Sequence, residues 1–459
     1  MDWPLAITVT SFLTGTLLVL GVWQRCVVRA QERHFEQQSQ EGRGQGEGRP
    51  VAQHPQINPY RCLGCGCCVR ACPEHGALAV IQGRACLVHP SRCIGHGYCE
   101  PACPVGALTV GLGDTSQRSD LPVLTPELET SVSGVFMAGE LGGIALIRHA
   151  IEQGSRVVET ILRRMQDEGV TPGGAGPVDV LIVGCGPAGI SAALKATECG
   201  LSCAVIEQND VGGTVRKYPR NKLTMTQPVD LPLFGRMKRT QYTKEELIQL
   251  WETVFSETGI EIQAGIKFTG LERTSDGTFR AETPEGTLPC RHVILALGRR
   301  GTPRRLGVPG EESETVLYEL MDAADHHDED ILVVGGGDSA IEAAIVLAAQ
   351  PGNRVTLSYR RDGFFRLKEP NRRRIMALQN EGRVDIVLNS QVTRIEEGRA
   401  TVDVREGDET RAVTLAADYV FILAGGEPPY PFLKGLGICF GGDVETASDR
   451  RAEPTEAQR

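Results

Sequence analysis

The sequence predicts an α/β fold: two domains of alternating strands and helices, preceded by a small α+β domain and one apolar N-terminal helix. Three observations predict it. From Val178 onward, β-rich apolar runs alternate with helical segments, as parallel βαβ units require. Two of these runs end in glycine-rich turns, which begin at Gly184 and Gly335. Nine of the 15 cysteines fall between Cys62 and Cys103, which indicates a separate cysteine-rich domain.

Length and composition narrow the functional class. A chain of 459 residues can form roughly two to four compact domains, and its 54 glycines suit a fold with many tight strand-to-helix turns. The formal net charge is −10, and no basic stripe interleaved with aromatic residues occurs. We therefore expect no nucleic acid partner.

The N-terminal segment predicts a membrane anchor. Residues 3–23 carry no charge and are mostly apolar, which is long enough as a helix to cross a bilayer. Three arginines follow this run, whereas only Asp2 precedes it: Arg25, Arg29 and Arg33. The positive-inside rule then predicts a single-pass protein of the cell membrane, with its catalytic body on the cytoplasmic side. A cleaved signal peptide is the alternative.

An internal repeat follows a flexible, polar linker. One pattern of cysteines and glycines begins at Arg61 and occurs again at Arg92, 31 positions later. Each copy leads into a short strand-like run. Such a duplication builds a pseudo-twofold unit whose core is metal rather than side chains.

The first copy reads C-x2-C-x2-C-x3-C-P, the pattern of bacterial 4Fe-4S sites. In such pairs the fourth cysteine of each run binds the other cluster. Cluster I is expected to be held by Cys62, Cys65, Cys68 and Cys103, and cluster II by Cys72, Cys93 and Cys99. A zinc site is the alternative, although zinc motifs rarely combine a tight triplet with a distant fourth ligand.

Cluster II departs from the pattern because His96 stands where the repeat predicts a cysteine. Imidazole in place of thiolate removes negative charge and should raise the reduction potential, as in Rieske centres. Two alternatives remain open: a 3Fe-4S cluster, or Cys86 as a substitute ligand. Cys67 aligns with Tyr98 of the second copy and is interpreted as a packing residue.

The first glycine loop predicts a dinucleotide site. It closes an apolar strand and opens a helix, and the next strand ends in Glu207, 18 residues past Gly189. That spacing lets a carboxylate accept hydrogen bonds from a ribose, while the helix N-terminus faces the pyrophosphate. The expected contacts in this Rossmann-like domain are Gly184, Gly186, Pro187, Ala188, Gly189 and Glu207.

The second loop predicts another Rossmann-like site with a different nucleotide. The strand that follows it leads into two arginines and has no acid at its tip, which favours a 2′-phosphate and hence NADP(H). The expected contacts are Gly335, Gly337, Asp338, Ser339, Ala340, Arg360 and Arg361, with Arg366 as a further candidate. The alternative is that the arginines form a solvated face.

Both loops, with the segments 295–298 and 308–311 between them, resemble the two-dinucleotide-binding flavoproteins. The similarity is greatest to the thioredoxin-reductase-like branch of the pyridine nucleotide–disulfide oxidoreductases, over about residues 118–445. This resemblance implies FAD at the first loop and NADP(H) at the second. The family's second FAD motif normally lies near the C-terminus, but here its counterpart is at 130–140. Gly139 and Glu140 would then approach the flavin.

The resemblance therefore implies a circularly permuted FAD domain. The expected domains are a transmembrane anchor (1–24), a linker (25–56), a ferredoxin-like domain (57–112), a permuted FAD segment (118–170), the FAD domain (176–311), the NADPH domain (312–415), a return to the FAD domain (416–445) and a disordered tail (446–459).

The absence of a redox cysteine pair indicates the chemistry. Val215 stands where one branch of the family has a cysteine, and residues 312–415 contain none. We therefore expect electrons to pass between NADPH, FAD and the clusters to a redox protein or membrane electron carrier. The alternatives are reduction of a small substrate, such as a low-molecular-weight disulfide or an unsaturated acid, at the flavin, and a non-enzymatic membrane redox sensor. The family resemblance makes a homodimer the expected assembly. No residue is predicted as a catalytic acid or base.

Overall fold

The structure is a computed structural model that divides into two compact units, Met1–Val110 and Gly111–Arg459. Each unit is considered by itself. The residues described are 13, 15–27, 29–30, 33, 35, 37, 54–93, 95, 97–111, 121–143, 146–174, 176–220, 222–225, 228–239, 241–299, 301–364, 367–407 and 409–441. The expected tail at 446–459 and most of the linker lie outside these ranges.

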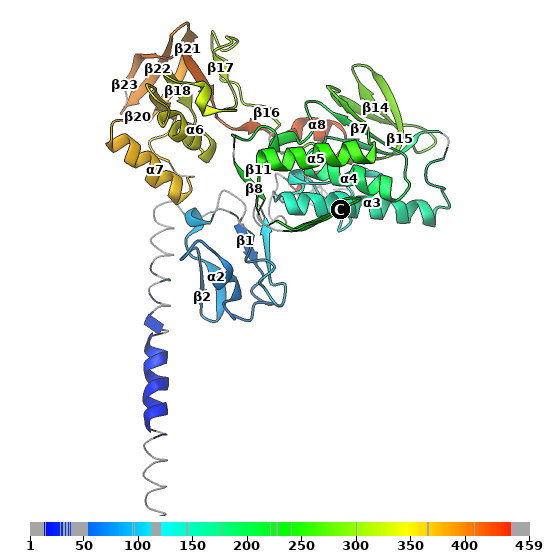
Figure 1. Cartoon of the computed structure of the whole chain (residues 1–459), viewed down its shortest axis with the longest axis horizontal. Coiled ribbons are helices and arrows are strands. Elements are labelled where there is room, and N and C mark those ends of the chain that lie inside the picture. The colour runs from blue at the N-terminus through cyan, green and yellow to red at the C-terminus, as the bar shows by residue number, and fades with distance from the viewer. Residues whose placement is uncertain are drawn as a thin grey trace, which may run out of the picture. The chain divides into compact units, whose positions relative to one another are not determined.

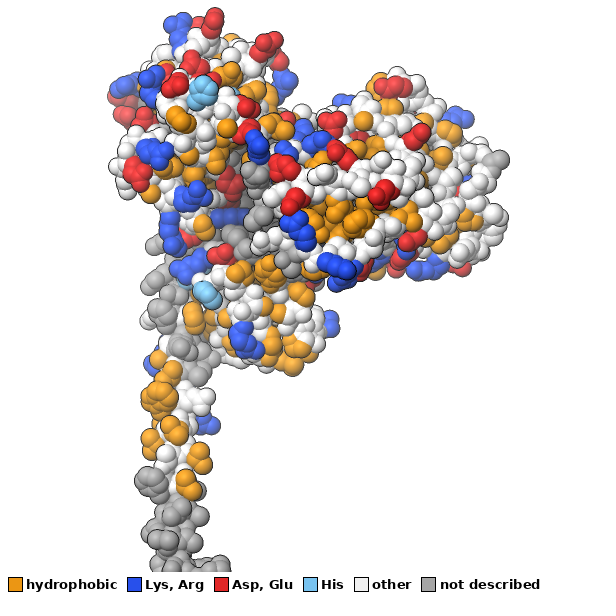
Figure 2. All heavy atoms as spheres, in the orientation of Figure 1, with side chains coloured by type: hydrophobic (Ala, Val, Ile, Leu, Met, Phe, Trp, Pro, Cys, Tyr) orange, Lys and Arg blue, Asp and Glu red, His pale blue; other side chains and the backbone are white. Residues whose placement is uncertain are grey.

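The N-terminal segment corrects the expectation of a membrane anchor. Residues 15–27 are helical, and many of their apolar side chains are exposed (Figure 2). Among the described residues, no helix is long and apolar enough to cross a membrane. The predicted single-pass anchor and cytoplasm-facing location are therefore wrong, although residues 1–12 and 14 of the expected span lie outside the described residues.

The first unit contains the cysteine-rich domain, drawn in blue and cyan in Figure 1. Its elements are β1 (His54–Ile57), α2 (Cys67–Ala71), β2 (Leu78–Ile81), β3 (Arg84–Leu87), the short helix η1 (Pro90–Arg92) and β4 (Leu108–Gly111). β1 pairs with β4, and β2 with β3. Gln82 and Gly83 both have positive φ, which suits the tight two-residue turn of the β2–β3 hairpin.

Alanine, leucine and valine side chains form the interior of this domain. No aromatic residue is buried among its described residues, and the buried aliphatic ones are Ala77, Leu78, Ala79, Ala85, Val88, Ala107, Leu108 and Val110. So small an apolar core stabilises a chain of this length weakly, and bound metal must supply much of the remainder.

The second unit begins with a sheet of seven strands. Its parallel part has the order β12–β7–β6–β15–β5: β12 (Ile262–Ala264), β7 (Cys203–Glu207), β6 (Val178–Val183), β15 (Gly286–Leu295) and β5 (Val135–Met137). β15 is long enough to pair both with parallel strands, β5 and β6, and with an antiparallel strand. Its first half pairs antiparallel with β14 (Phe279–Thr283), which pairs with β13 (Gly270–Arg273).

Two helices pack together against the parallel strands, α3 (Ile147–Asp167) and α4 (Pro187–Glu198), as Figure 1 shows. They approach closely because Gly154 has no side chain: a Cβ there would lie 2.2 Å from the Ala188 carbonyl oxygen. Ser191 of α4 adds a buried hydrogen bond of 2.7 Å to the Ile151 carbonyl. Thus β5 and α3, which precede β6 in the sequence, are integral parts of this domain.

A second parallel sheet has the order β17–β24–β18–β19–β20. Its strands are Val316–Leu317, Tyr419–Ile422, Asp330–Val334, Arg354–Ser358 and Val384–Val387. α6 (Asp338–Ala348) and α7 (Glu369–Asn380) pack in one core beside it. The other core contains a three-stranded antiparallel sheet, β21 (Ser390–Glu396), β22 (Arg399–Glu406) and β23 (Glu409–Ala416). Each domain thus combines a parallel sheet with an antiparallel one.

Shorter elements complete the second unit. They are η3 (Glu140–Gly142), η4 (Gly213–Val215), β8 (Leu223–Met225), β9 (Val229–Leu231), β10 (Gly235–Met237), β11 (Tyr242–Thr243), α5 (Lys244–Thr258), β16 (Thr302–Pro303), η5 (Ala323–Asp325), β25 (Gly426–Glu427) and α8 (Tyr430–Gly435). β16 and β25 pair where the chain leaves the first domain and returns to it.

One partly buried ion pair joins the segment before β5 to α3. Arg164 donates two hydrogen bonds to Glu129, at 2.5 and 2.8 Å, and Glu129 also accepts one from the Gly134 amide at 2.9 Å. Glu129 is 9% exposed. The hydrogen bond from Arg164 is the main reason that the pKa of Glu129 lies below its ordinary value.

We expect Glu129→Ala to lower the free energy of unfolding by about 2 kcal/mol at neutral pH, because it leaves Arg164 unpaired. A carboxylate with a lowered folded-state pKa stabilises the protein above its ordinary pKa, and this contribution is lost as the pH falls through the lowered value. Urea unfolding at neutral pH and in acid checks both statements. Glu257→Ala, at an exposed position of α5, is the control. If the difference in unfolding free energy between wild type and Glu129→Ala stayed the same in acid, the stabilising role assigned to the ionised Glu129 would be contradicted.

Candidate functional site

The two cysteine loops of the first unit have the same backbone shape. Gly64 and Gly66 of the first copy have φ of 65° and 70°, and their counterparts Gly95 and Gly97 both have 79°. Such angles favour glycine, because a side chain would be strained there. At Gly64 a Cβ would also lie 2.1 Å from the Gly83 carbonyl oxygen. The repeat seen in the sequence is therefore a repeat of structure.

Two arginines at equivalent positions join the halves of the repeat. Arg61 donates to the Val105 carbonyl at 2.9 Å, and Arg92 to the His75 carbonyl at 3.5 Å. Each bond runs from the start of one copy to the loop that follows the last cysteine of the other. This crossed arrangement is what sharing of the fourth cysteine between the clusters requires.

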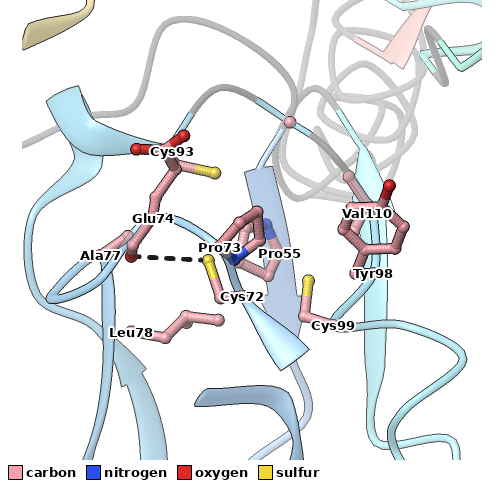
Figure 3. A pocket seen from close by; sticks show the side chains of 12 residues that line it. Pro55, Cys72, Pro73, Glu74, Ala77, Leu78, Cys93, Tyr98, Cys99 and Val110 are labelled. Atoms are coloured by element: carbon pink, nitrogen blue, oxygen red, sulfur yellow. Dashed lines mark hydrogen bonds between the residues drawn. The ribbon is translucent and has the colours of Figure 1, made fainter. Parts of the chain in front are cut away.

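Three predicted ligands of cluster II line one pocket, shown in Figure 3. Cys72, Cys93 and Cys99 reach it from different parts of the chain, and the Cys72 thiol donates to the Glu74 carbonyl at 3.6 Å. Burial, then the nearby Cys93 and Cys72, raises the pKa of Cys99 to about 12. Three thiols crowded in an apolar pocket without a cation are poorly stabilised as thiolates, so the site suits a metal cluster that neutralises them.

The fourth predicted ligand of cluster II, His96, lies outside the described residues. Its two neighbours in the sequence, Gly95 and Gly97, both line the pocket. Cys86, the alternative ligand, does not line this pocket; its thiol donates to the Arg84 carbonyl at 3.7 Å.

The cluster I cysteines are brought together separately. Burial raises the pKa of Cys68, and Cys62 and Cys103 are close enough to raise it further. Backbone amides point at two of these sulfurs: Ala85 N–H donates to Cys62 at 3.4 Å and Ala107 N–H to Cys103 at 3.2 Å. Amide donors of this kind stabilise the negative charge of a thiolate-bound cluster.

Cys65, the fourth member of this set, is exposed, and hydrogen bonding to Cys67 lowers its pKa. Cys67 itself accepts a hydrogen bond from Arg70 at 3.2 Å. Among the described residues, no three metal-binding side chains are placed to hold a single metal ion. The ligands of a cubane stand farther apart than those of one tetrahedral ion, since each binds a different iron.

The first glycine loop connects β6 to α4. Gly184 has a φ of 105°, and a Cβ there would lie 2.5 Å from the Ala296 carbonyl oxygen; at Gly189 it would lie 1.8 Å from that of Gly184. At Gly186, by contrast, a Cβ would meet nothing within 4 Å. Two glycines are thus required by packing, and the third leaves space over the N-terminus of α4 for a phosphate.

Glu207 lies at the end of β7, where the sequence predicts it. Its carboxylate accepts from the Cys185 amide at 2.6 Å and the Asn209 amide at 2.8 Å, and it is 8% exposed. The two amides fix the position of the carboxylate, whose oxygens can still accept further hydrogen bonds, such as those from a ribose.

The buried Nε1 of Trp251 has no hydrogen-bond partner among the described residues. The Gly212 turn packs on this ring.

The upstream segment reaches the same loop. A Cβ at Gly139 would lie 3.3 Å from the Ala188 Cβ, in the first turn of α4, and the Gly139 amide donates to Gln153 at 2.7 Å. Glu140 begins the short helix η3 directly after it. The predicted FAD contacts from residues 139–140 and 184–189 are therefore adjacent in space.

The second loop, between β18 and α6, repeats this geometry. A Cβ at Gly335 would lie 2.4 Å from the Leu423 carbonyl oxygen, while at Gly337 it would meet nothing within 4 Å. Ala340 is buried and Ser339 is exposed at the start of α6. Arg360 and Arg361 follow β19 and are exposed, and neither guanidinium is ion-paired among the described residues. Arg366 lies outside those residues.

Asp338 makes contacts that the sequence does not reveal. Its carboxylate accepts from the Lys368 amide at 3.1 Å and from Asn371 Nδ2 at 2.8 Å, so it joins α6 to the start of α7. Tyr359 was also missed: a Cβ at Gly336 would lie 2.2 Å from its ring, which stacks on Phe364 at 5.6 Å. In the sequence, an aromatic pair after a glycine loop only weakly indicates the role of Tyr359. Nothing in the sequence indicates the hydrogen bond between Asp338 and Asn371.

Models of two protein families match this chain. The family model of the pyridine nucleotide-disulphide oxidoreductases matches residues 181–456, more than half of the chain. A model of the 4Fe-4S dicluster domain matches residues 54–104.

Individual relatives agree. A ferredoxin–NADP reductase of Ignicoccus hospitalis is 33% identical over 59% of this chain and 85% of its own length. Bacilliredoxin reductase Bdr of Bacillus subtilis is 28% identical over 56% and 80%. The solved bacillithiol disulfide reductase Bdr of Bacillus cereus has a TM-score of 0.50 at 24% identity, over 57% of this chain and 82% of that one, which shows the fold alone.

The cofactors of this protein are FAD, NADP(H) and 4Fe-4S clusters. The chain belongs to the pyridine nucleotide-disulphide oxidoreductases, as an enzyme of that family that carries an additional 4Fe-4S dicluster domain.

Proposed function

We propose that the enzyme transfers electrons from NADPH to a redox protein, with Cys65 and its partner cysteines holding the cluster nearest the acceptor. The first glycine loop and residues 139–140 would hold FAD, which when bound would supply the exchange between a two-electron nicotinamide and one-electron clusters. The ferredoxin–NADP reductase among the relatives supports a protein acceptor. The non-enzymatic alternative is set aside because the family consists of oxidoreductases.

The observation that carries this proposal is the closeness of Gly139 to the first turn of α4, where a Cβ on Gly139 would lie 3.3 Å from the Ala188 Cβ. The segment that follows the iron–sulfur domain is part of the first glycine-loop site. In the sequence, residues 112–120 separate this segment from the iron–sulfur domain. The chain thereby tethers the cysteine-rich domain to the element that borders the expected flavin site.

We interpret β5 and α3 as a circularly permuted C-terminal segment of the FAD domain. β5 pairs parallel with β15 and completes the parallel order β12–β7–β6–β15–β5. In the family that the sequence resembles, the corresponding segment lies near the C-terminus of the chain. Permutation needs chain ends that lie near each other, which is common in compact domains. We retain the homodimer as the expected assembly.

A thiol relay beside the flavin is not favoured. Val215 is buried at the position where one branch of the family has a cysteine. Burial raises the pKa of Cys185 to about 12, with the Glu207 charge adding to it, and burial also raises that of Cys203. Thiols held neutral in this way are poor nucleophiles, so we assign them to packing.

A second candidate function is direct reduction of a small disulfide at the flavin. It is favoured by the relatives named for bacilliredoxin and bacillithiol disulfide reduction. In that case the clusters would supply electrons to the flavin or accept them from it, and a small disulfide would be reduced without a protein carrier.

We expect Cys65→Ser to abolish reduction of a protein electron carrier while leaving the rate of flavin reduction by NADPH within about twofold of wild type, because it removes one ligand of cluster I. Cys439→Ser is the matched control and should behave as wild type, since Cys439 is exposed in the second unit and is not an expected ligand. Anaerobic stopped-flow absorbance measures both steps. Full carrier reduction by Cys65→Ser would support the second candidate instead.

We expect Arg361→Ala to raise the KM for NADPH about 10- to 100-fold and to leave that for NADH unchanged, because it removes a partner of the 2′-phosphate. Arg411→Ala, an exposed change on β23, serves as the control. Steady-state kinetics with both nucleotides decide the matter. A wild-type preference for NADH that the substitution does not alter would overturn the assignment of NADPH.

We propose His96 as the fourth ligand of cluster II, since the residues on both sides of it line the pocket. His96→Cys should then lower the reduction potential of that cluster, because thiolate adds negative charge. Redox titration followed by electron paramagnetic resonance measures the shift. Cys86→Ser should change nothing; if it alters the cluster II signal while His96→Cys does not, Cys86 is the ligand.

A further inference from the structure

One end of the iron–sulfur domain exposes large apolar side chains beside a predicted ligand. Tyr60 is 93% exposed and Leu63 is 69% exposed, and both are close in sequence to Cys62 and to Cys65, which is itself exposed. Apolar groups of this size next to a redox centre are unusual on a surface that meets only water.

Three arginines surround this loop. Arg70 donates to the Cys65 carbonyl at 3.3 Å, and Arg61 to the Val105 carbonyl, which follows the ligand Cys103. Arg84 is exposed at the start of β3, next to Gly83, on whose carbonyl the loop packs at Gly64. We call these five residues the cluster I surface: Tyr60, Arg61, Leu63, Arg70 and Arg84.

The charge of this surface differs from that of the chain. Residues 54–111 contain four arginines and only two acids, Glu74 and Glu100, in a protein with a net charge of −10. Glu74 lines the cluster II pocket. The charged residues of the cluster I surface are all arginines.

One predicted ligand of cluster I reaches solvent. Each set has one buried cysteine, Cys68 at 7% exposed in cluster I and Cys99 at 6% in cluster II, but Cys65 of cluster I is exposed. An electron that leaves for another protein can leave through this exposed ligand.

We propose that the cluster I surface is the docking site of a small acidic one-electron carrier protein, with Tyr60 and Leu63 as its apolar contacts. This inference rests on the proposed function and names the partner's chemistry. Interfaces of transient redox pairs are small, so a few apolar side chains within a charged rim are sufficient. The cations steer an acidic carrier, and they raise the association rate more than the final affinity.

The test is stopped-flow reduction of two carriers by the NADPH-reduced holoprotein: an acidic bacterial-type ferredoxin and basic cytochrome c. The charge-reversed variant Arg70→Glu with Arg84→Glu should reduce the ferredoxin about tenfold more slowly at low salt, with a smaller deficit at high salt. Reduction of cytochrome c should not slow. Arg411→Glu, an equal change in charge on β23, should leave both rates unchanged.

A second variant guards against damage to the cluster, because Arg70 also contacts Cys67. Tyr60→Ala with Leu63→Ser keeps all charges and should slow ferredoxin reduction at every salt concentration. Iron content and the paramagnetic signals of the reduced clusters must match wild type in both variants.

Two results would overturn the proposal. One is ferredoxin reduction at the wild-type rate in both variants. The other is slower transfer from flavin to clusters within the protein, which would mean that the surface serves an internal step. Failure of the proposed function would look different, since the wild-type clusters would then stay oxidised after NADPH had reduced the flavin.

Discussion

The structure depends on the close contact between α3 and α4. Gly154 permits it, since any side chain there would collide with the Ala188 carbonyl, and the buried bond from Ser191 to Ile151 reinforces it. α4 also forms the N-terminal end that faces the expected pyrophosphate. The contact therefore fixes the upstream segment, with Gly139 at its loop, against the first glycine loop.

The two units are stabilised by different means. The α/β unit has extended apolar cores on both faces of its sheets, with large buried side chains such as Trp251 and Phe421. The cysteine-rich domain has a much smaller core of alanine, leucine and valine side chains, with Cys68 and Cys99 also buried. Bound clusters would add to the stability of this small domain. Each of its paired loops contains left-handed glycines, such as Gly64 and Gly95.

The parts of the site that sequence predicts best are those whose chemistry is local. A glycine loop between a strand and a helix requires Gly184 and Gly189 for packing, and Cys62 and Cys103 lie near Cys68, with which the sequence groups them. Contacts between distant segments could not be predicted from the sequence. The hydrogen bond from Asn371 to Asp338, for example, has no sequence signature. The N-terminal anchor was wrong because composition alone predicted a span, whereas no described helix has the necessary length and apolarity.

The central claim is that electrons from NADPH reach the clusters through the site where Gly139 meets Ala188. Rapid freeze-quench electron paramagnetic resonance after anaerobic mixing with NADPH tests it most directly. The account predicts that the signal of reduced clusters grows as the reduced flavin is reoxidised, within a single turnover and at equal rates. Flavin that remains fully reduced while the clusters stay oxidised would contradict it.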